Sequence, residues 1–160
     1  MPVIGCGVMD SLYDRDLVLW AAHQARELRA AADAGWNAPI DWENVAEEIE
    51  SLGKAERHAL ASHISIVIEH LLKLQVSPAT EPVRGWRDSV RRARREIERL
   101  LQESPSLRRE VPSIILREMA ATRALVLANL QDCGEEPVVD VSGVAYDEGQ
   151  VLGDWLPERG

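Results

Sequence analysis

Apolar residues recur every three or four positions from Asp41 to Gln75, the longest proline-free amphipathic stretch of the chain. This spacing is helical, because a strand would alternate apolar and polar positions every second residue. Asp41 is placed to cap the N-terminus, and Ser77-Pro78 ends the helix because proline lacks the N–H donor. Gly53 interrupts the pattern and predicts either a kink or a close approach of another helix. The apolar stripe consists of Trp42, Val45, Ala46, Ile49, Leu52, Gly53, Leu60, Ile64, Val67, Leu71 and Leu74.

Three further stretches, at 12–34, 85–103 and 112–132, carry the same spacing. Ser11 is the expected N-cap of the first helix and Gly35 its C-terminal stop. The connection to the central helix is short, so these two helices should pack antiparallel. Three tryptophans fall at inward positions of these helices and are expected in the core: Trp20, Trp42 and Trp86.

Ser104-Pro105 is a restart signal, and Pro112 should interrupt the helical pattern a second time. We therefore expect a short helical turn at 105–110 before the fourth main helix. Gly134 should end that helix. The acidic segment after Gly134 is expected to be irregular, with one short helix from about Asp147, and Tyr146 and Val151 are among its apolar anchors.

The predicted fold is all-α: an antiparallel bundle of four main helices with a broken fourth segment and an irregular acidic tail. In domain terms, residues 1–10 form a flexible segment, 11–134 the bundle, and 135–160 a tail packed on the bundle. Met9 would also serve as a start codon, so residues 1–8 are a candidate extension of the gene model.

Composition fits a soluble protein, with 46% hydrophobic and 28% charged residues. No apolar run comes near the roughly 20 residues that span a bilayer, and no signal peptide is evident. A cytoplasmic location and no membrane partner are therefore expected. Cys6 and Cys133 are too few for a disulfide framework or a zinc knuckle. The net charge of −9 does not favour nucleic-acid binding.

The best candidate for a polar site lies along one edge of the central helix. Glu56, His63 and His70 follow one another in steps of seven residues, and each step rotates only about 20° on a straight helix. Folding the first hairpin brings Tyr13, Asp14 and Asp16 toward them. Imidazole and carboxylate groups could bind a metal or perform acid–base work there. The competing and favoured interpretation is structural, with these groups satisfying one another or capping backbone groups.

The 85–103 helix carries a face rich in arginine. Arg87, Arg91, Arg94 and Arg95 are candidates for binding phosphates or an acidic partner. A solvated face supported by neighbouring acids is the favoured interpretation. A third is that these arginines hold the chain's own tail, since eight acids and one arginine lie from Asp132 onward.

Several common chemistries have no support in the sequence. There is no Gly-x-Ser-x-Gly motif, no Gly-rich phosphate loop and no His-Glu-x-x-His. No histidine has an acid three positions before it, as the di-metal carboxylate pattern requires. We therefore expect no metal and no cofactor, and whether the chain is an enzyme stays open.

The chain resembles the bacterial domain-of-unknown-function family 29 over residues 12–130. The tail departs from the family pattern and keeps only an acidic-aromatic-Leu-Pro segment. The resemblance implies a small all-helical bundle and no activity. The motifs that carry it are Leu12-Tyr13-Asp14-Arg15-Asp16 with Trp20 and Gln24-Ala25, Asp41-x-x-Asn44-x-Ala46-Glu47-Glu48-Ile49-Glu50-Ser51-Leu52-Gly53, His70-Leu71-Leu72-Lys73-Leu74-Gln75, Trp86-Arg87, Ser104-Pro105-Ser106-Leu107 and Asp154-Trp155-Leu156-Pro157.

The sequence therefore favours a non-enzymatic interaction or regulatory module, with an unknown protein partner or self-association as a homodimer. The first alternative is a metal-binding or hydrolytic bundle built on the His/carboxylate cluster. A weaker alternative is nucleic-acid binding through the arginine-rich helix.

Overall fold

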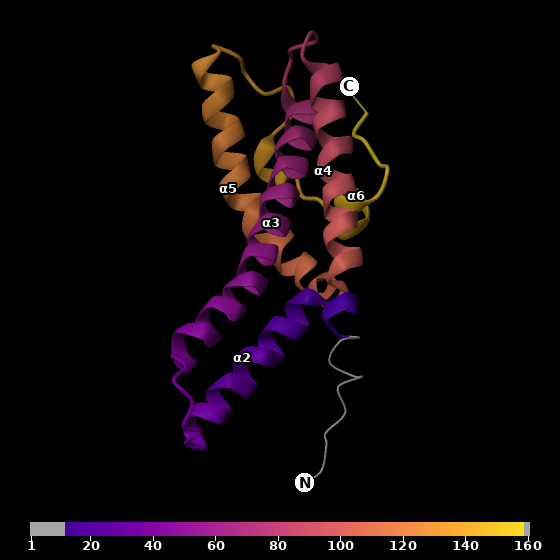
Figure 1. Ribbon diagram of the computed structural model, residues 1–160. Helices are drawn as coiled ribbons and strands as arrows, with labels where there is room; N and C mark the ends of the chain where they lie inside the picture. Colours follow the sequence, from indigo (N-terminus) through magenta and orange to yellow (C-terminus); the bar gives the residue numbers. More distant parts are fainter. Residues whose placement is uncertain (1–11, 159–160) are drawn as a thin grey trace. The chain divides into compact units, whose positions relative to one another are not determined.

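The computed structural model describes residues 12–158, which contain helices and no strand (Figure 1). The predicted all-α class with four long helices is confirmed. The predictions for residues 1–10 and for Ser11 as a cap lie outside the described part of the chain. After a helical turn at 12–15, the elements are α2 (Leu17–Asp33), α3 (Trp42–Val76), α4 (Val83–Glu103), the 3₁₀ helix η1 (Pro105–Glu110), α5 (Val111–Asp132), the 3₁₀ helix η2 (Val141–Gly143) and α6 (Glu148–Leu152).

The chain forms two compact units, and the domain bounds predicted from the sequence stay a prediction. The described part of unit 1 comprises residues 12–59 and 100–108, so it holds α2, the first half of α3, the end of α4 and most of η1. Unit 2 comprises residues 60–99 and 109–158, with the second half of α3, most of α4, α5 and the tail. The 35-residue helix α3 contributes to both units and remains continuous at Gly53.

The start of the first helix differs from the prediction. The expected helix from 12 to 34 is broken at Asp16, whose backbone is extended with φ −160° and ψ 93°. Asp16 is the N-cap of α2, and its carboxylate accepts a hydrogen bond from the Leu19 N–H at 2.9 Å. The apolar period continues across residues 12–34, and it therefore did not reveal that a capping side chain divides the segment.

The two predicted glycine stops are confirmed. Gly35 and Gly134 have φ values of 72° and 69°, in the left-handed region that glycine adopts without a steric penalty. After α2, the N–H of Gly35 donates to Ala32 and that of Trp36 to Ala31. This paired arrangement is a Schellman motif, which satisfies the last carbonyl groups of the helix.

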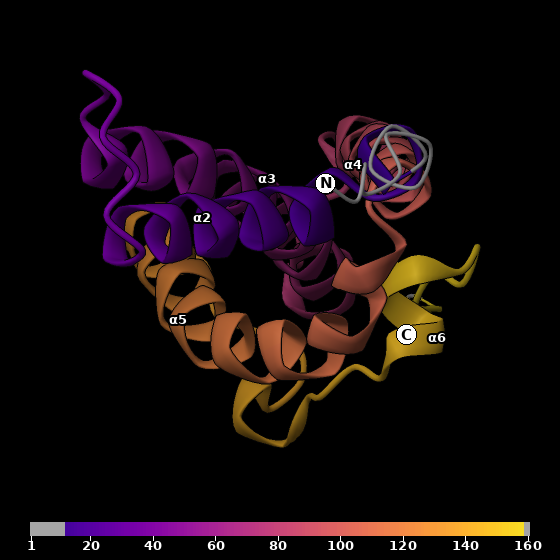
Figure 2. The same cartoon turned by 60° about the horizontal axis from the view of Figure 1, so that its bottom comes forward.

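Unit 1 combines a helical hairpin with segment 100–108, in which Leu100, Leu101 and Leu107 are buried. α2 and the first half of α3 lie side by side and antiparallel (Figures 1 and 2). A Cβ atom at Gly53 would lie 3.7 Å from the Val18 carbonyl oxygen. Of the two sequence interpretations, Gly53 therefore marks a close approach of helices. The buried residues between the two helices are small: Val18, Ala21, Ala25 and Ala46.

Unit 2 contains the larger core. The second half of α3 buries one residue after another, with Leu60, Ile64, Val67, Ile68, Leu71 and Leu72 all at 0% exposure. α4 runs alongside this part of α3 in both views, as the short loop between them requires (Figures 1 and 2). The predicted break is also confirmed: η1 ends at Glu110, and Pro112 lies in the first turn of α5.

The tail is tied to unit 2 by buried anchors and by backbone contacts. Tyr146 is 6% exposed and Val151 0%. α6 begins at a capping box, in which Asp147 and Gln150 each bond the other's backbone N–H. Arg94 donates to the carbonyl oxygens of Gln150, Val151 and Trp155 at 2.7, 2.9 and 2.7 Å.

Candidate functional site

The first part of the predicted polar cluster, in unit 1, has a structural role. Asp16 is 5% exposed and holds residues distant in sequence. Besides capping α2, its carboxylate accepts from the Ser106 N–H at 2.7 Å and from the Ser106 hydroxyl at 2.9 Å. Beside it, the Val18 N–H donates to the Ser104 hydroxyl at 3.4 Å. The three hydrogen bonds that Asp16 accepts all come from the protein itself. Asp16 is therefore a joint between the start of α2 and segment 104–106.

Tyr13 and Asp14 lie on the surface of unit 1. Tyr13 is 54% exposed, and its ring meets that of Trp20 edge to face with centroids 4.8 Å apart. Asp14 is exposed as well. The structure thus assigns Tyr13 to an aromatic pair, and the two residues frame no enclosed site.

Glu56, His63 and His70 are all half-buried, and they are divided between the units. In unit 1, Glu56 has one carboxylate oxygen that is buried and has no hydrogen-bond partner. In unit 2, the Nδ1 atom of His70 is hydrogen-bonded to the carbonyl oxygen of Ile66 in the same helix, at 2.9 Å. Within residues 12–158, no group of three or more His, Cys, Asp or Glu side chains is arranged to hold a metal ion.

The arginine-rich face is divided between two roles. Arg94 does not face solvent as an anion ligand, because it clamps the tail through three carbonyl oxygens. Burial lowers the pKa of its guanidinium, while Asp154 acts in the opposite direction. Arg91 pairs with Asp88 at 3.1 Å, and Arg87 and Arg95 are exposed. The clamp on the tail, which the sequence suggested through charge, acts through backbone carbonyl groups.

One side of the unit 1 hairpin is closed by ion pairs. Arg29 of α2 contacts Glu43 and Glu50 of α3, each at 3.2 Å. These hydrogen bonds, first the one that Arg29 donates to Glu43, raise the pKa of Arg29. The hydrogen bond from Arg29, followed by the charge of Lys54, lowers the pKa of the Glu50 carboxyl. This side of the hairpin is polar and self-satisfied.

The opposite side of the hairpin carries a row of apolar side chains. Nine residues correspond to a rotation of about 180°, so Trp20 lies opposite Arg29 on α2, and Leu52 opposite Glu43 on α3. Val45 is 38% exposed and Leu52 44%. We call this surface the hairpin face; it consists of Trp20, Leu28, Val45, Ile49 and Leu52, the other three being half-buried.

The tryptophans differ from the sequence prediction. Trp20, Trp42 and Trp86 were expected in the core, and all three are half-buried. Trp20 belongs to the hairpin face and Trp86 lines a pocket of unit 2. Trp36, in the turn of the hairpin, is 68% exposed. The helical period locates the apolar side of a helix, but it does not show whether another layer covers that side.

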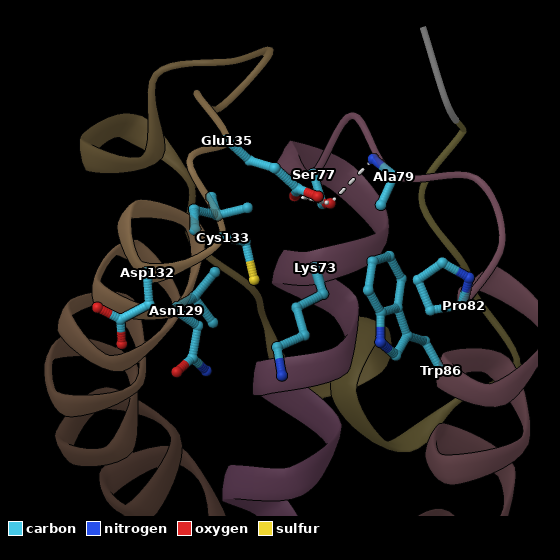
Figure 3. Close-up of a pocket in the computed structure, with 11 residues that line it drawn as sticks. Lys73, Ser77, Ala79, Pro82, Trp86, Asn129, Asp132, Cys133 and Glu135 are labelled. Atoms are coloured by element: carbon cyan, nitrogen blue, oxygen red, sulfur yellow. Dashed lines mark hydrogen bonds between the residues drawn. The ribbon is translucent and has the colours of Figure 1, made fainter.

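The pocket of unit 2 was not found from the sequence. It has a volume of about 370 Å³ and lies where the C-terminal ends of α3 and α5 meet the start of α4 (Figure 3). Its wall is apolar at Trp86, and the Cys133 thiol points into the space between α5 and α3 (Figure 3). The residues that line it are Lys73, Ser77, Ala79, Pro82, Trp86, Val126, Asn129, Leu130, Asp132, Cys133 and Glu135.

Lining residues come from separate segments of the chain, so no short motif could have revealed this pocket. The signal available was indirect. Pro82 and Trp86 come after the predicted end of the central helix, and Cys133 precedes the glycine that ends α5. The sequence predicts a core position for Trp86 and a helix end at Gly134, and neither prediction indicates a pocket.

α3 is long and apolar enough to cross a membrane by length and composition, with a window of mean hydropathy 1.2 that is 44% buried. Among the described residues it is the one helix that passes this test. The sequence prediction considered only uninterrupted apolar runs. This window instead averages the hydropathy of apolar and polar residues along the helix. The same side chains form the core of unit 2, and the core helix of a folded domain passes the test equally well.

Fold and sites together define an all-α protein with four long helices, a capped hairpin with an exposed apolar face, and a tail held by Arg94. The chain belongs to the family described as "Domain of unknown function DUF29", whose model matches residues 12–136. The resemblance inferred from the sequence is therefore confirmed.

Among solved structures, the chain is similar to an alpha-helical protein of unknown function from Rhodospirillum rubrum ATCC 11170. The two are 23% identical, the match covers 89% of each chain, and the TM-score is 0.67. This likeness shows a shared fold. No curated protein matches the chain.

Proposed function

We propose that the protein is a non-enzymatic interaction module of the bacterial cytoplasm, which self-associates through the hairpin face of unit 1. The observation that carries this proposal is the exposure of Val45 and Leu52, at 38% and 44%, on an apolar surface of two helices. A helix buries its apolar stripe against another layer of structure. Among the described residues of unit 1, Val45 and Leu52 remain exposed on this face.

A second copy of the chain is the occupant that best fits this surface. Two hairpins facing each other give four helices, an arrangement in which each helix buries its apolar side in a common core. With a twofold axis the contact is self-complementary, because the same surface of each copy faces the other.

The size of the surface is adequate. α2 has 17 residues, so it is about 25 Å long, and two adjacent helices are roughly 20 Å wide. Stable dimers bury about 800 Å² of accessible surface per partner. A face of this size covers about 500 Å² in projection and more as accessible surface, so it approaches this area.

The test is the oligomeric state of Leu52→Lys. Sedimentation velocity from about 1 to 500 μM should show a dimer for the unchanged protein. The variant should raise the dimer dissociation constant at least 100-fold, because each dimer would enclose two unpaired ammonium groups. Circular dichroism should be unchanged, since Leu52 is already 44% exposed in one chain.

Leu116→Lys is the matched control. Leu116 is 78% exposed on α5 of unit 2, so it undergoes the same change of charge at an apolar surface position. It should leave the dimer intact. A monomer at every concentration overturns the proposal, as does a dimer that Leu116→Lys dissociates and Leu52→Lys does not.

A further inference from the structure

We propose that the pocket of unit 2 binds a small apolar or aromatic molecule that carries an ammonium group. The inference does not depend on self-association, because every residue that lines the pocket belongs to unit 2. Its volume of about 370 Å³ is within the range of small-molecule sites, which begins near 300 Å³.

The apolar part of the ligand is specified by the walls. Trp86 and Pro82 stand on one side (Figure 3). Val126 and Leu130 contribute from α5. An indole in such a wall offers both a flat apolar surface and a negative π face, which attracts cations within about 6 Å.

The sign of the ligand's charge is specified by the polar groups. Lys73 is already neutralised, because its ammonium contacts Glu69 at 2.5 Å and both side chains are only about one-fifth exposed. The Glu135 carboxylate points toward the Ser77 hydroxyl, 3.1 Å away, and is half-buried at the pocket rim (Figure 3). Asp132 turns outward in the same view.

The partial charges at the helix ends also favour a cation in this pocket. α3 ends at Val76 and α5 at Asp132, so two helices direct their negative C-terminal ends at this region. The N-terminal end of α4 opposes them as a single positive end. With Lys73 paired, the Glu135 carboxylate and the two C-terminal ends leave a negative field, which selects a cation.

The probe for this site is phenethylamine, which is a cation at neutral pH. Phenethyl alcohol and 3-phenylpropionate are its neutral and anionic counterparts of similar size. Two-dimensional ¹H–¹⁵N NMR follows the indole N–H of Trp86, assigned with Trp86→Phe. The Trp86 resonance should shift saturably with phenethylamine, with an affinity at least 10-fold higher than for either counterpart.

Glu135→Gln should weaken phenethylamine binding at least five-fold and leave the alcohol unchanged. Glu136→Gln is the matched control, since Glu136 is exposed and does not line the pocket. In the unchanged protein, raising the salt concentration should weaken binding of the amine and leave that of the alcohol unaffected. This measurement decides the question even where Glu135→Gln does not fold.

Three results would overturn the proposal. The first is the absence of a saturable shift at Trp86 with the amine. The second is binding of 3-phenylpropionate as tight as that of phenethylamine, which would identify Lys73 as the dominant charge. The third is equal binding of the amine and the alcohol, which would reduce the site to an apolar cavity. None of these results bears on the hairpin face, so the two proposals fail separately.

Discussion

At the scale of single residues, two of the candidate polar side chains, Asp16 and Arg94, use their hydrogen bonds to hold the fold together. Asp16 accepts from Leu19 and twice from Ser106, and Arg94 donates to three carbonyl oxygens of the tail. In a sequence motif, a carboxylate or guanidinium that stabilises the fold looks the same as one that binds a ligand, because its hydrogen-bond partners are not known. Its burial and hydrogen bonds in the structure decide between the two roles.

Asp16→Ala should destabilise the protein by about 3 kcal/mol. The change removes three hydrogen bonds to a charged group, each worth about 1.5–3 kcal/mol, and they share one side chain, so they do not add fully. Urea unfolding followed by circular dichroism measures the loss. Asp14→Ala is the control: Asp14 is exposed, so its effect should stay within about 0.5 kcal/mol. An unchanged urea midpoint for Asp16→Ala would contradict the assignment of Asp16 as a joint.

Tyr146 should make the protein sensitive to alkali. Burial raises the pKa of its hydroxyl above the ordinary value of 10, and the hydroxyl donates to Gln75 at 2.8 Å. Between the ordinary and the raised pKa, the unfolded chain has lost this proton and the folded chain keeps it. Stability is therefore fully present below pH 10 and falls as the pH rises, by at most about 1.4 kcal/mol per pH unit.

The comparison with Tyr146→Phe isolates this effect. At pH 7 the variant should be less stable by about 1 kcal/mol, because Gln75 loses its hydrogen-bond donor. Above pH 10 the difference should shrink and then reverse, because phenylalanine does not ionise. Urea midpoints at pH 7, 9, 10 and 11 measure it. Parallel losses in both proteins would show that Tyr146 is not the group responsible.

At the scale of elements, the sequence predicted most of the fold because helix ends carry local signals. Gly35, Gly134 and Pro112 act within one turn of the chain, and the structure uses each of them as predicted. The break at Asp16 was missed because the apolar period continues across it, although the cap itself is local and bonds the Leu19 N–H. The additional bonds from Ser106, about 90 residues away, have no signal in this segment.

Gly53 is a second position where the sequence pattern alone left the structure undecided. A glycine inside a helical period left two interpretations, a kink or a close approach. The structure selects the second, because the Val18 backbone lies where a larger side chain would extend. Periodicity gives the direction in which a residue points, and only the fold gives the distance to its neighbours.

The candidate site was the least predictable part for a related reason. Glu56, His63 and His70 were grouped by their common edge of one helix, and that edge passes from unit 1 into unit 2. The pocket at Trp86 draws on separate segments, and the hairpin face combines side chains of two helices, of which Val45 and Leu52 are exposed. Neither property belongs to any one stretch of sequence.

At the scale of the whole molecule, stability should be distributed unevenly along the continuous helix α3. Its second half buries Leu60, Val67 and Leu71 completely, whereas Val45 and Leu52 in the first half are exposed. Local opening is easiest where few apolar groups are buried. Native-state hydrogen exchange should therefore protect amides at 64–74 at least 100-fold more than those at 46–53, measured on dilute protein.

Raising the protein concentration provides the control for this comparison. If a second copy covers the hairpin face, protection at 46–53 should rise with concentration, while protection at 64–74 stays fixed by the core of unit 2. The Leu52→Lys variant should remove that dependence on concentration. Equal protection along all of α3 in dilute solution would mean that both halves open as one cooperative unit. That result would contradict an uneven distribution of stability along the helix.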